Sequence, residues 1–257
     1  MASQQELAQT FHDLHVKGSP VILFNIWDPG SAQAVASQGA KAIATGSHGV
    51  ANAFGYEDGE LIPLEVALSN AERVVNSTNL PVTMDIEAGY GATADDVERT
   101  ALQVIKTGVI GVNMEDQLLG QADLRSSDEQ SERIAAVRRA AITTGVDLFI
   151  NARTDLFKNA DPNTHNDALL DQALERAQAY AAAGADGFFV PLIKDIGLIT
   201  RLCNESPLPV NIILLPGMPS PSELAAAGVA RISYGPIPYL NMIEWLKQQA
   251  KAAQSSI

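Results

Sequence analysis

The stretch that decides the fold is PVTMDIEAGYGATADDVERTALQVIKTGVIGVNME, residues 81–115. It begins with an apolar strand, continues through a helical segment over residues 93–107 that ends before Gly108, and closes with a second apolar strand. A strand–helix–strand unit of this kind is typical of a parallel sheet whose faces are covered by helices. The stretch therefore predicts an α/β protein.

The alternation of strand and helix repeats along the whole chain, after a lead-in helix over residues 3–17. The expected strands cover residues 21–27, 41–45, 81–87, 109–115, 147–153, 186–191, 209–215 and 230–235. The expected helices cover residues 31–39, 63–78, 93–107, 128–144, 167–183, 195–204, 220–227 and 237–253. Eight such units favour a closed (β/α)8 TIM barrel over an open doubly wound sheet. With no linker or shift of composition, we expect one domain over residues 1–257.

Composition and charge exclude several classes of protein. A chain of 257 residues, 46% hydrophobic and 18% charged, can bury a large core without disulfides. A net charge of −13 makes nucleic acid and anionic membranes unfavourable partners. The single cysteine excludes a disulfide framework and a four-cysteine zinc site. Without a secretory signal or a long apolar run, the chain is expected to be soluble and cytoplasmic.

Polar side chains gather at the carboxyl ends of the expected strands, where barrels of this class carry their active sites. Strand alternation turns eight of them towards the barrel axis: Asn25, Asp85, Glu87, Asn113, Glu115, Asn151, Arg153 and Asn211. Three buried acids need a nearby cation. Oxygen ligands without histidine or thiolate favour Mg²⁺ or Mn²⁺ over Zn²⁺, so Asp85, Glu87 and Glu115 form the predicted metal site. The alternative is that these acids cap helices or pair with Arg153 and lysines.

Seven stretches carry a resemblance to a known family: NIWDPGSAQAVASQGAKAIATGS, FGYEDGE, PVTMDIEAGYG, GVNMEDQ, INARTD, AGADGFFVP and GVARISYGP. In order and spacing they resemble the isocitrate lyase/phosphoenolpyruvate mutase superfamily, along nearly the whole chain. The resemblance implies a (β/α)8 barrel, one Mg²⁺, small 2-oxo or 2-hydroxy acid substrates and an enolpyruvate-like intermediate. It also implies a homodimer or homotetramer in which the last barrel helix is swapped between subunits.

The resemblance assigns metal and substrate roles to single residues. Asp85 and Glu87 match the family's acid-x-acid metal motif, in which the second acid is more often Asp, and Glu115 of MEDQ matches the third acid. Arg153 of NARTD matches the arginine that grips the substrate, and Asp58 of YEDGE matches an acid on a mobile gating loop.

Further residues are expected around the substrate. Thr45, Gly46 and Ser47 match the turn whose hydroxyl and amides hold a substrate carboxylate. His48 follows that turn and is either a proton carrier or a structural histidine. The remaining candidates for the pocket wall are Trp27, Asn113, Asn211 and, beside two glycines, Tyr90. The other histidines, His12, His15 and His165, are expected on the surface.

The sequence also departs from the family. The isocitrate-cleaving lyases carry a Lys-(Lys/Arg)-Cys-Gly-His loop after the fourth strand, whereas this chain has QLLGQADLRSSDEQ at residues 117–130. Its one cysteine, Cys203, lies on the sixth helix and is expected to pack in the core. The mutase branch has a histidine at the end of the sixth strand, where this chain has Val190 and Pro191. Arg125 is the one replacement charge in the loop for a phosphonyl group.

Three functions stay open at this point. The first is a Mg²⁺-dependent lyase or decarboxylase that cleaves a carbon–carbon bond in a small 2-oxo or 2-hydroxy di- or tricarboxylic acid. The second is a phosphonomutase or phosphonopyruvate hydrolase that acts on a carbon–phosphorus bond. The third is a non-catalytic barrel that binds a metal or an acid. We also expect residues 118–130 and the Asp58 loop to close over the bound acid.

Overall fold

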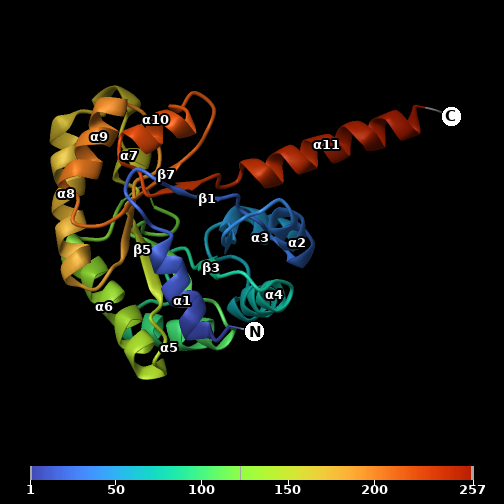
Figure 1. Ribbon diagram of the computed structural model, residues 1–257, viewed down its shortest axis with the longest axis horizontal. Coiled ribbons are helices and arrows are strands. Elements are labelled where there is room, and N and C mark those ends of the chain that lie inside the picture. Colours follow the sequence, from blue (N-terminus) through green and yellow to red (C-terminus); the bar gives the residue numbers. More distant parts are fainter. Residues whose placement is uncertain (1, 122, 256–257) are drawn as a thin grey trace.

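The computed structural model describes residues 2–121 and 123–255, and within them eight strands form one parallel sheet (Figure 1). The strands are β1 (Val21–Leu23), β2 (Ile43–Ala44), β3 (Val82–Asp85), β4 (Gly111–Glu115), β5 (Phe149–Arg153), β6 (Gly187–Phe189), β7 (Val210–Ile213) and β8 (Arg231–Ser233). Neighbours in sequence pair from β2 to β8, and β1 pairs with β8. A parallel bridge from Ile26 to Thr45 closes the sheet, so the prediction of a (β/α)8 barrel is confirmed.

Helices alternate with the strands and cover the outside of the barrel (Figure 1). They are α1 (Gln4–Asp13), α2 (Pro29–Ser37), α3 (Ser47–Ala53), α4 (Leu64–Asn76), α5 (Ala94–Lys106), α6 (Ser127–Thr144), α7 (Leu156–Asn159), α8 (Asp167–Ala182), α9 (Ile196–Glu205), α10 (Pro221–Ala226) and α11 (Ile237–Gln254). Capping boxes begin α1, α2, α5 and α10. The sequence did not predict α3, α7 or the 3-10 turn η1 (Pro162–Thr164), because such short segments show no apolar period.

An inner apolar cluster seals the amino end of the barrel. Phe11 of α1 is fully buried, and its ring meets that of Phe149 edge-on at 5.2 Å. His15 stacks on the same Phe149 ring at 4.1 Å, so the expectation that His15 is a surface residue is wrong. Burial, helped by the nearby charge of Arg231, lowers the pKa of His15 to about 3. This end is closed by rings, which leaves the carboxyl end for chemistry.

The last helix, α11, projects away from the barrel in Figure 1. Its Leu240, Trp245 and Leu246 are between 45% and 59% exposed. On the outer face of β1 and just beyond it, Ile22 and Phe24 are 41% and 42% exposed. These two apolar side chains of the barrel's outer face are therefore only partly covered. Among the described helices none has the length and apolar character needed to cross a membrane, and the cytoplasmic location stays a prediction.

Candidate functional site

A cavity of about 280 Å³ opens at the carboxyl ends of the strands. Its polar side includes eight of the predicted residues: Asn25, Gly46, Ser47, His48, Asp58, Asp85, Asn113 and Arg153. Its apolar side comprises Phe189, Pro191, Leu192, Ile213 and Leu215. An adjoining cleft of about 220 Å³ shares Ser47, Asp58, Arg153 and Lys158 with the cavity and adds Glu87 and Glu115. The structure therefore brings most of the predicted residues to one place.

Three predicted residues support the cavity from behind instead of lining it. The Thr45 hydroxyl accepts a hydrogen bond from the Asp85 backbone N–H at 3.0 Å and so holds the end of β3. The Trp27 ring packs edge-on against the Tyr239 ring, with the ring centroids 5.2 Å apart. Asn211 is 1% exposed and accepts a hydrogen bond from the Ser233 hydroxyl at 3.0 Å.

The turn at residues 45–47 differs from its expected role. The Thr45 N–H donates to the Thr83 carbonyl at 3.0 Å, and the Gly46 N–H donates to the Ile26 carbonyl at 3.1 Å. Both amides are used to close the barrel, so neither is available to hold a substrate carboxylate. The Ser47 N–H lies 3.5 Å from Asp85 Oδ2 and, of the three, is the one that faces the site. The prediction is thus corrected from three amides to one.

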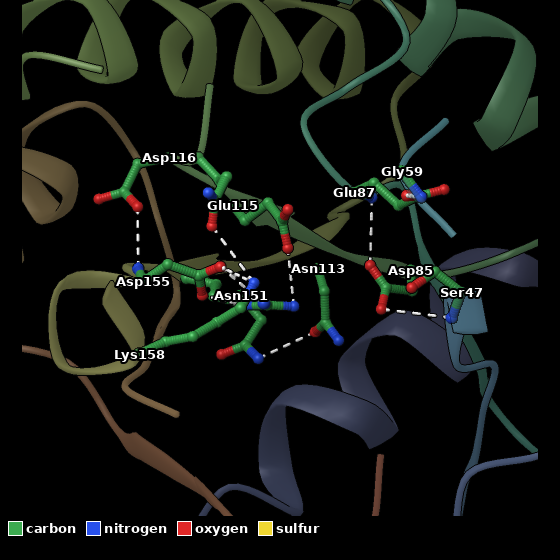
Figure 2. Close-up of polar contacts among 12 residues, drawn as sticks. Ser47, Gly59, Asp85, Glu87, Asn113, Glu115, Asp116, Asn151, Asp155 and Lys158 are labelled. Atoms are coloured by element: carbon green, nitrogen blue, oxygen red, sulfur yellow. Dashed lines mark hydrogen bonds and ion pairs between the residues drawn. The ribbon is translucent and has the colours of Figure 1, made fainter. Parts of the chain in front are cut away.

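Glu87 is turned towards the loop that carries Asp58. Its Oε2 accepts hydrogen bonds from the Gly59 and Glu60 N–H groups at 2.7 and 2.8 Å, and its Oε1 accepts one from the Tyr90 hydroxyl at 3.1 Å. The backbone of Glu87 has a φ of 51°, a left-handed conformation that ends the alternation of β3. Glu87 therefore holds the loop that carries Asp58, and its carboxylate is largely occupied by these hydrogen bonds (Figure 2).

Arg153 is clamped by two acids. Its Nη1 lies 2.7 Å from Glu115 Oε2, and its Nε and Nη2 donate to the two carboxylate oxygens of Asp155 at 2.6 and 2.8 Å. Lys158 of α7 donates to Asp155 Oδ2 at 2.6 Å, and Asp116 Oδ1 accepts from the Asp155 N–H at 2.9 Å (Figure 2). The expected alternative, that an acid pairs with Arg153, therefore holds for Glu115.

Burial and mutual repulsion raise the pKa values of the three acids of the site. Burial raises the pKa of Asp85, and the charge of Asp58 adds to the rise. Burial raises the pKa of Glu87 to about 7, with repulsion from Asp85 and Asp58 contributing. Burial also raises the pKa of Glu115 to about 8, although Arg153 opposes the rise. A divalent cation beside Asp85 would relieve this repulsion.

Asp85 is the carboxylate best placed to hold such an ion. Its Oδ1 accepts one hydrogen bond, from the Glu87 N–H at 3.1 Å, and its Oδ2 makes only the long contact with Ser47. Across residues 2–121 and 123–255, no three acidic, histidine or cysteine side chains converge closely enough to chelate one ion. Mg²⁺ usually keeps several waters and takes one or two carboxylates, so this donor set fits it.

A family model described as phosphoenolpyruvate phosphomutase matches residues 11–254 of the chain. The chain belongs to the isocitrate lyase/phosphoenolpyruvate mutase superfamily. It is accordingly an enzyme of this superfamily, whose members include carbon–carbon lyases, mutases and hydrolases. The expected family resemblance is confirmed.

Three relatives illustrate the range of this superfamily. A solved structure from Burkholderia cenocepacia, provisionally named a phosphonomutase, is 48% identical with a TM-score of 0.96, covering 98% of this chain and 100% of that one. Oxaloacetate decarboxylase of Pseudomonas entomophila is 31% identical over 95% of this chain and 83% of the relative. The 2-methylisocitrate lyase of Escherichia coli is 28% identical over 88% and 77%, respectively.

The structure also shows where the residues lie at which the sequence departs from the family pattern. Cys203 packs in the core on α9, where burial raises the pKa of its thiol to about 12. Arg125 donates to Glu129 at 2.8 Å and does not line the cavity. Gln117, Leu119 and Gly120 do line the adjoining cleft, in keeping with a covering loop, while residue 122 of the proposed lid lies outside the described residues.

Several lining residues were missed from the sequence. Lys158 lies on α7, which was not predicted, although its spacing of three from Asp155 on a helical turn was a readable signal. Ile213 follows Asn211 by two positions on β7 and so shares its inward face. Phe189 ends β6, and its ring lies 5.7 Å from the Arg153 guanidinium carbon.

The raised pKa values predict a stability that depends on pH. Between about pH 4.5 and 8 the folded protein keeps protons on Glu87 and Glu115 that the unfolded chain has released. The free energy of unfolding of the metal-free protein should therefore fall as pH rises through this window. The charge of Mg²⁺ bound at Asp85 would lower the pKa of both neighbouring carboxyl groups, so MgCl₂ should raise the melting temperature more at about pH 8 than at about pH 5. KCl of the same ionic strength is the control. Equal shifts of the melting temperature at both pH values would contradict the placement of the Mg²⁺ site at Asp85.

The Glu87 contacts predict a loop that depends on side-chain length. In Glu87→Asp the carboxylate is one methylene shorter and cannot reach both amides of residues 59 and 60. At about pH 8, where Glu87 is mostly ionised, hydrogen bonds to its charged group contribute about 1.5–3 kcal/mol, so exchange of these two amides with deuterium should accelerate roughly tenfold or more. Mass spectrometry of peptides covering residues 55–60 measures the change, with the exposed Glu57→Asp as control. Unaltered exchange in Glu87→Asp would show that Glu87 does not hold the loop.

Proposed function

We propose that this enzyme is a Mg²⁺-dependent lyase that cleaves a carbon–carbon bond in a small 2-oxo or 2-hydroxy di- or tricarboxylic acid. One observation carries the proposal: Asp85, which fits a hydrated cation, and Arg153, a clamped guanidinium, line the same cavity. The cation that Asp85 would hold and the guanidinium of Arg153 are the two positive groups that such a dianionic acid requires. Mn²⁺ is the alternative ion for the same donors.

The cavity favours a small acid with one polar and one apolar side. Ser47, Arg153 and Lys158 lie on the polar side, and Phe189, Leu192 and Ile213 lie on the apolar side. A volume of about 280 Å³ is at the small end for ligand sites. The apolar side excludes water from the reacting carbon, which strengthens the electrostatic interactions across the cavity.

The residues of this chain divide the work as follows. When bound, Mg²⁺ would polarise the substrate carbonyl as a Lewis acid. Arg153 binds a substrate carboxylate through N–H groups whose direction is already fixed by Glu115 and Asp155, so little ordering is left to the moment of binding. As the carbon–carbon bond of a 2-oxo acid breaks, its electron pair enters the enolate of the keto group. In a 2-hydroxy acid, His48 or Asp58 first accepts the hydroxyl proton, a carbonyl forms at that carbon, and the electron pair enters the enolate of the departing carboxylic acid. A proton then returns to the carbon from His48 or Asp58, which both line the cavity.

A phosphonomutase or phosphonopyruvate hydrolase is the second candidate. The 48% identity to the Burkholderia cenocepacia structure favours it. Against it, Arg125 is paired with Glu129 away from the cavity, and the end of β6 presents Phe189 and Pro191 in place of a polar group. The non-catalytic alternative is disfavoured because the relatives in the superfamily are enzymes.

An assay panel separates the candidates. With Mg²⁺, we expect turnover of oxaloacetate or 2-methylisocitrate and none of phosphonopyruvate. Pyruvate and succinate report the lyase reactions, phosphate reports the hydrolase reaction, and phosphoenolpyruvate reports the mutase reaction. Asp85→Asn removes the ion-binding charge and should lower kcat/KM by about 10³-fold or more, because Lewis-acid stabilisation contributes several kcal/mol. The exposed Asp95→Asn on α5 is the matched control. Conversion of phosphonopyruvate alone, or full activity of Asp85→Asn, would overturn the proposal.

We also propose that two copies of the chain pair by exchanging α11, as the family resemblance implies. The exposed Leu240, Trp245 and Leu246 of one copy would cover the exposed Ile22 and Phe24 of the other. The projection of α11 from its own barrel supports this arrangement (Figure 1). Higher assemblies, such as a tetramer of two pairs, are compatible with it.

Light scattering after size-exclusion chromatography tests the pairing. The wild-type protein should have at least twice the mass of one chain, and Trp245→Glu should shift it towards one chain by placing a charge in an apolar contact. The equally charged Gln249→Glu, on the same helix, is the control. A wild-type protein that runs as a single chain at all concentrations would exclude the pairing.

A further inference from the structure

Arg231 is a charged side chain inside the barrel to which the reaction has given no role. It begins β8, is 1% exposed, and forms no ion pair within the described ranges 2–121 and 123–255. Burial lowers the pKa of its guanidinium, with Asp85 as the opposing influence. A buried cation without a paired acid destabilises a fold, so packing alone is a poor reason for an arginine at this position.

The hydrogen bonds of Arg231 fix the direction of its neighbours. Its Nη2 donates to Asn113 Oδ1 at 3.1 Å, and its Nε makes a longer contact of 3.4 Å with the Ser233 hydroxyl. A guanidinium only donates, so the side-chain amide of Asn113 must turn its oxygen towards Arg231. Asn151 Nδ2 donates to the same Oδ1 at 2.9 Å (Figure 2). Both acceptor positions of the Asn113 oxygen are therefore filled.

The amide nitrogen of Asn113 is then left for the cavity. Asn113 lines the cavity and lies directly beside Asp85 in the register of β3 and β4. Without Arg231, the contact between Asn113 and Asn151 is equally compatible with both amides reversed, since each carries one donor and one acceptor end. Reversal would present an oxygen, and so a repulsive partner, to an anion in the cavity.

We propose that Arg231 is a positioning residue that orients Asn113 so that its N–H groups donate to the anionic substrate, next to the position where Asp85 acts. The inference rests on the proposed function, because it assumes an anion at this place in the cavity. Arg231 fixes the direction of a second hydrogen bond in the same way. The Ser233 hydroxyl accepts from Arg231 and donates to Asn211 Oδ1 at 3.0 Å. One buried cation thus sets the direction of several hydrogen bonds beneath the substrate.

The decisive variant is Arg231→Met, which keeps much of the side-chain volume and removes the charge. Replacing an uncompensated buried charge by an apolar side chain should leave the melting temperature unchanged or raise it. The loss of one oriented donor should nevertheless lower kcat about tenfold to a hundredfold, with a smaller change in KM. Arg231→Lys keeps a donor-only cation and should recover part of the loss. The exposed Arg139→Met is the control and should keep full activity.

A double-mutant cycle shows whether Arg231 acts through Asn113. If it does, Arg231→Met combined with Asn113→Ala should be no slower than Asn113→Ala alone. Losses that multiply in the double variant would overturn the proposal, and so would full activity of Arg231→Met. A loss of melting temperature in Arg231→Met that Arg231→Lys restores together with activity would also overturn it, since the role would then be structural.

Oxalate keeps this test separate from the test of the proposed function. Oxalate is a planar dianion with the shape of an enolate of a 2-oxo acid, and its binding in the presence of Mg²⁺ is measured by calorimetry without turnover. Arg231→Met should weaken oxalate binding roughly tenfold. A wild-type protein that binds oxalate but cleaves no carbon–carbon bond would end the proposed function alone, whereas unchanged oxalate binding in Arg231→Met would end the role of Arg231.

Discussion

Carboxylates outnumber cations at the mouth of the barrel, and the arrangement of the site follows from this imbalance. Arg153 cannot neutralise every acid around it. Two of its N–H groups donate to Asp155, which also accepts a hydrogen bond from Lys158. Burial alone would raise the pKa of Asp155, but these two cations hold it below its usual range. Glu115 keeps one contact with Arg153 and a raised pKa, and Asp85 keeps the most open coordination.

The sequence predicted the barrel and much of its mouth because both depend on local periodicity. Asp85 pairs in register with Asn113, and Asn113 with Asn151, so alternation along β3, β4 and β5 was enough to place these side chains at one level. The same rule, applied to β8, identifies Arg231 and Ser233 as inward residues, although only the fold shows which side chains they meet.

Other features depend on conformation or on distant contacts, and alternation could not supply them. Glu87 has a left-handed backbone conformation, so its side chain goes to the loop at residues 59–60 and not to the predicted metal site. The amides of Thr45 and Gly46 are used by Thr83 and Ile26, because the sheet must close between its first and second strands. His15 is partly buried because it stacks on the ring of Phe149, which lies 134 positions away in the chain.

The seal at the amino end has a consequence for the traffic of small molecules. Phe11, Phe149 and the neighbouring apolar side chains pack the barrel axis at that end, and each of these two rings is at most 2% exposed. A molecule that binds in the cavity at the carboxyl end would therefore enter and leave on one side of the barrel, where the loop that Glu87 holds contributes Asp58 to the lining. When one molecule yields two fragments in such a dead-end chamber, the fragment nearer that side leaves first and the one seated deeper leaves last. The depth at which each fragment sits thus determines the order of release, and the deeper fragment is the one that competes with the next substrate.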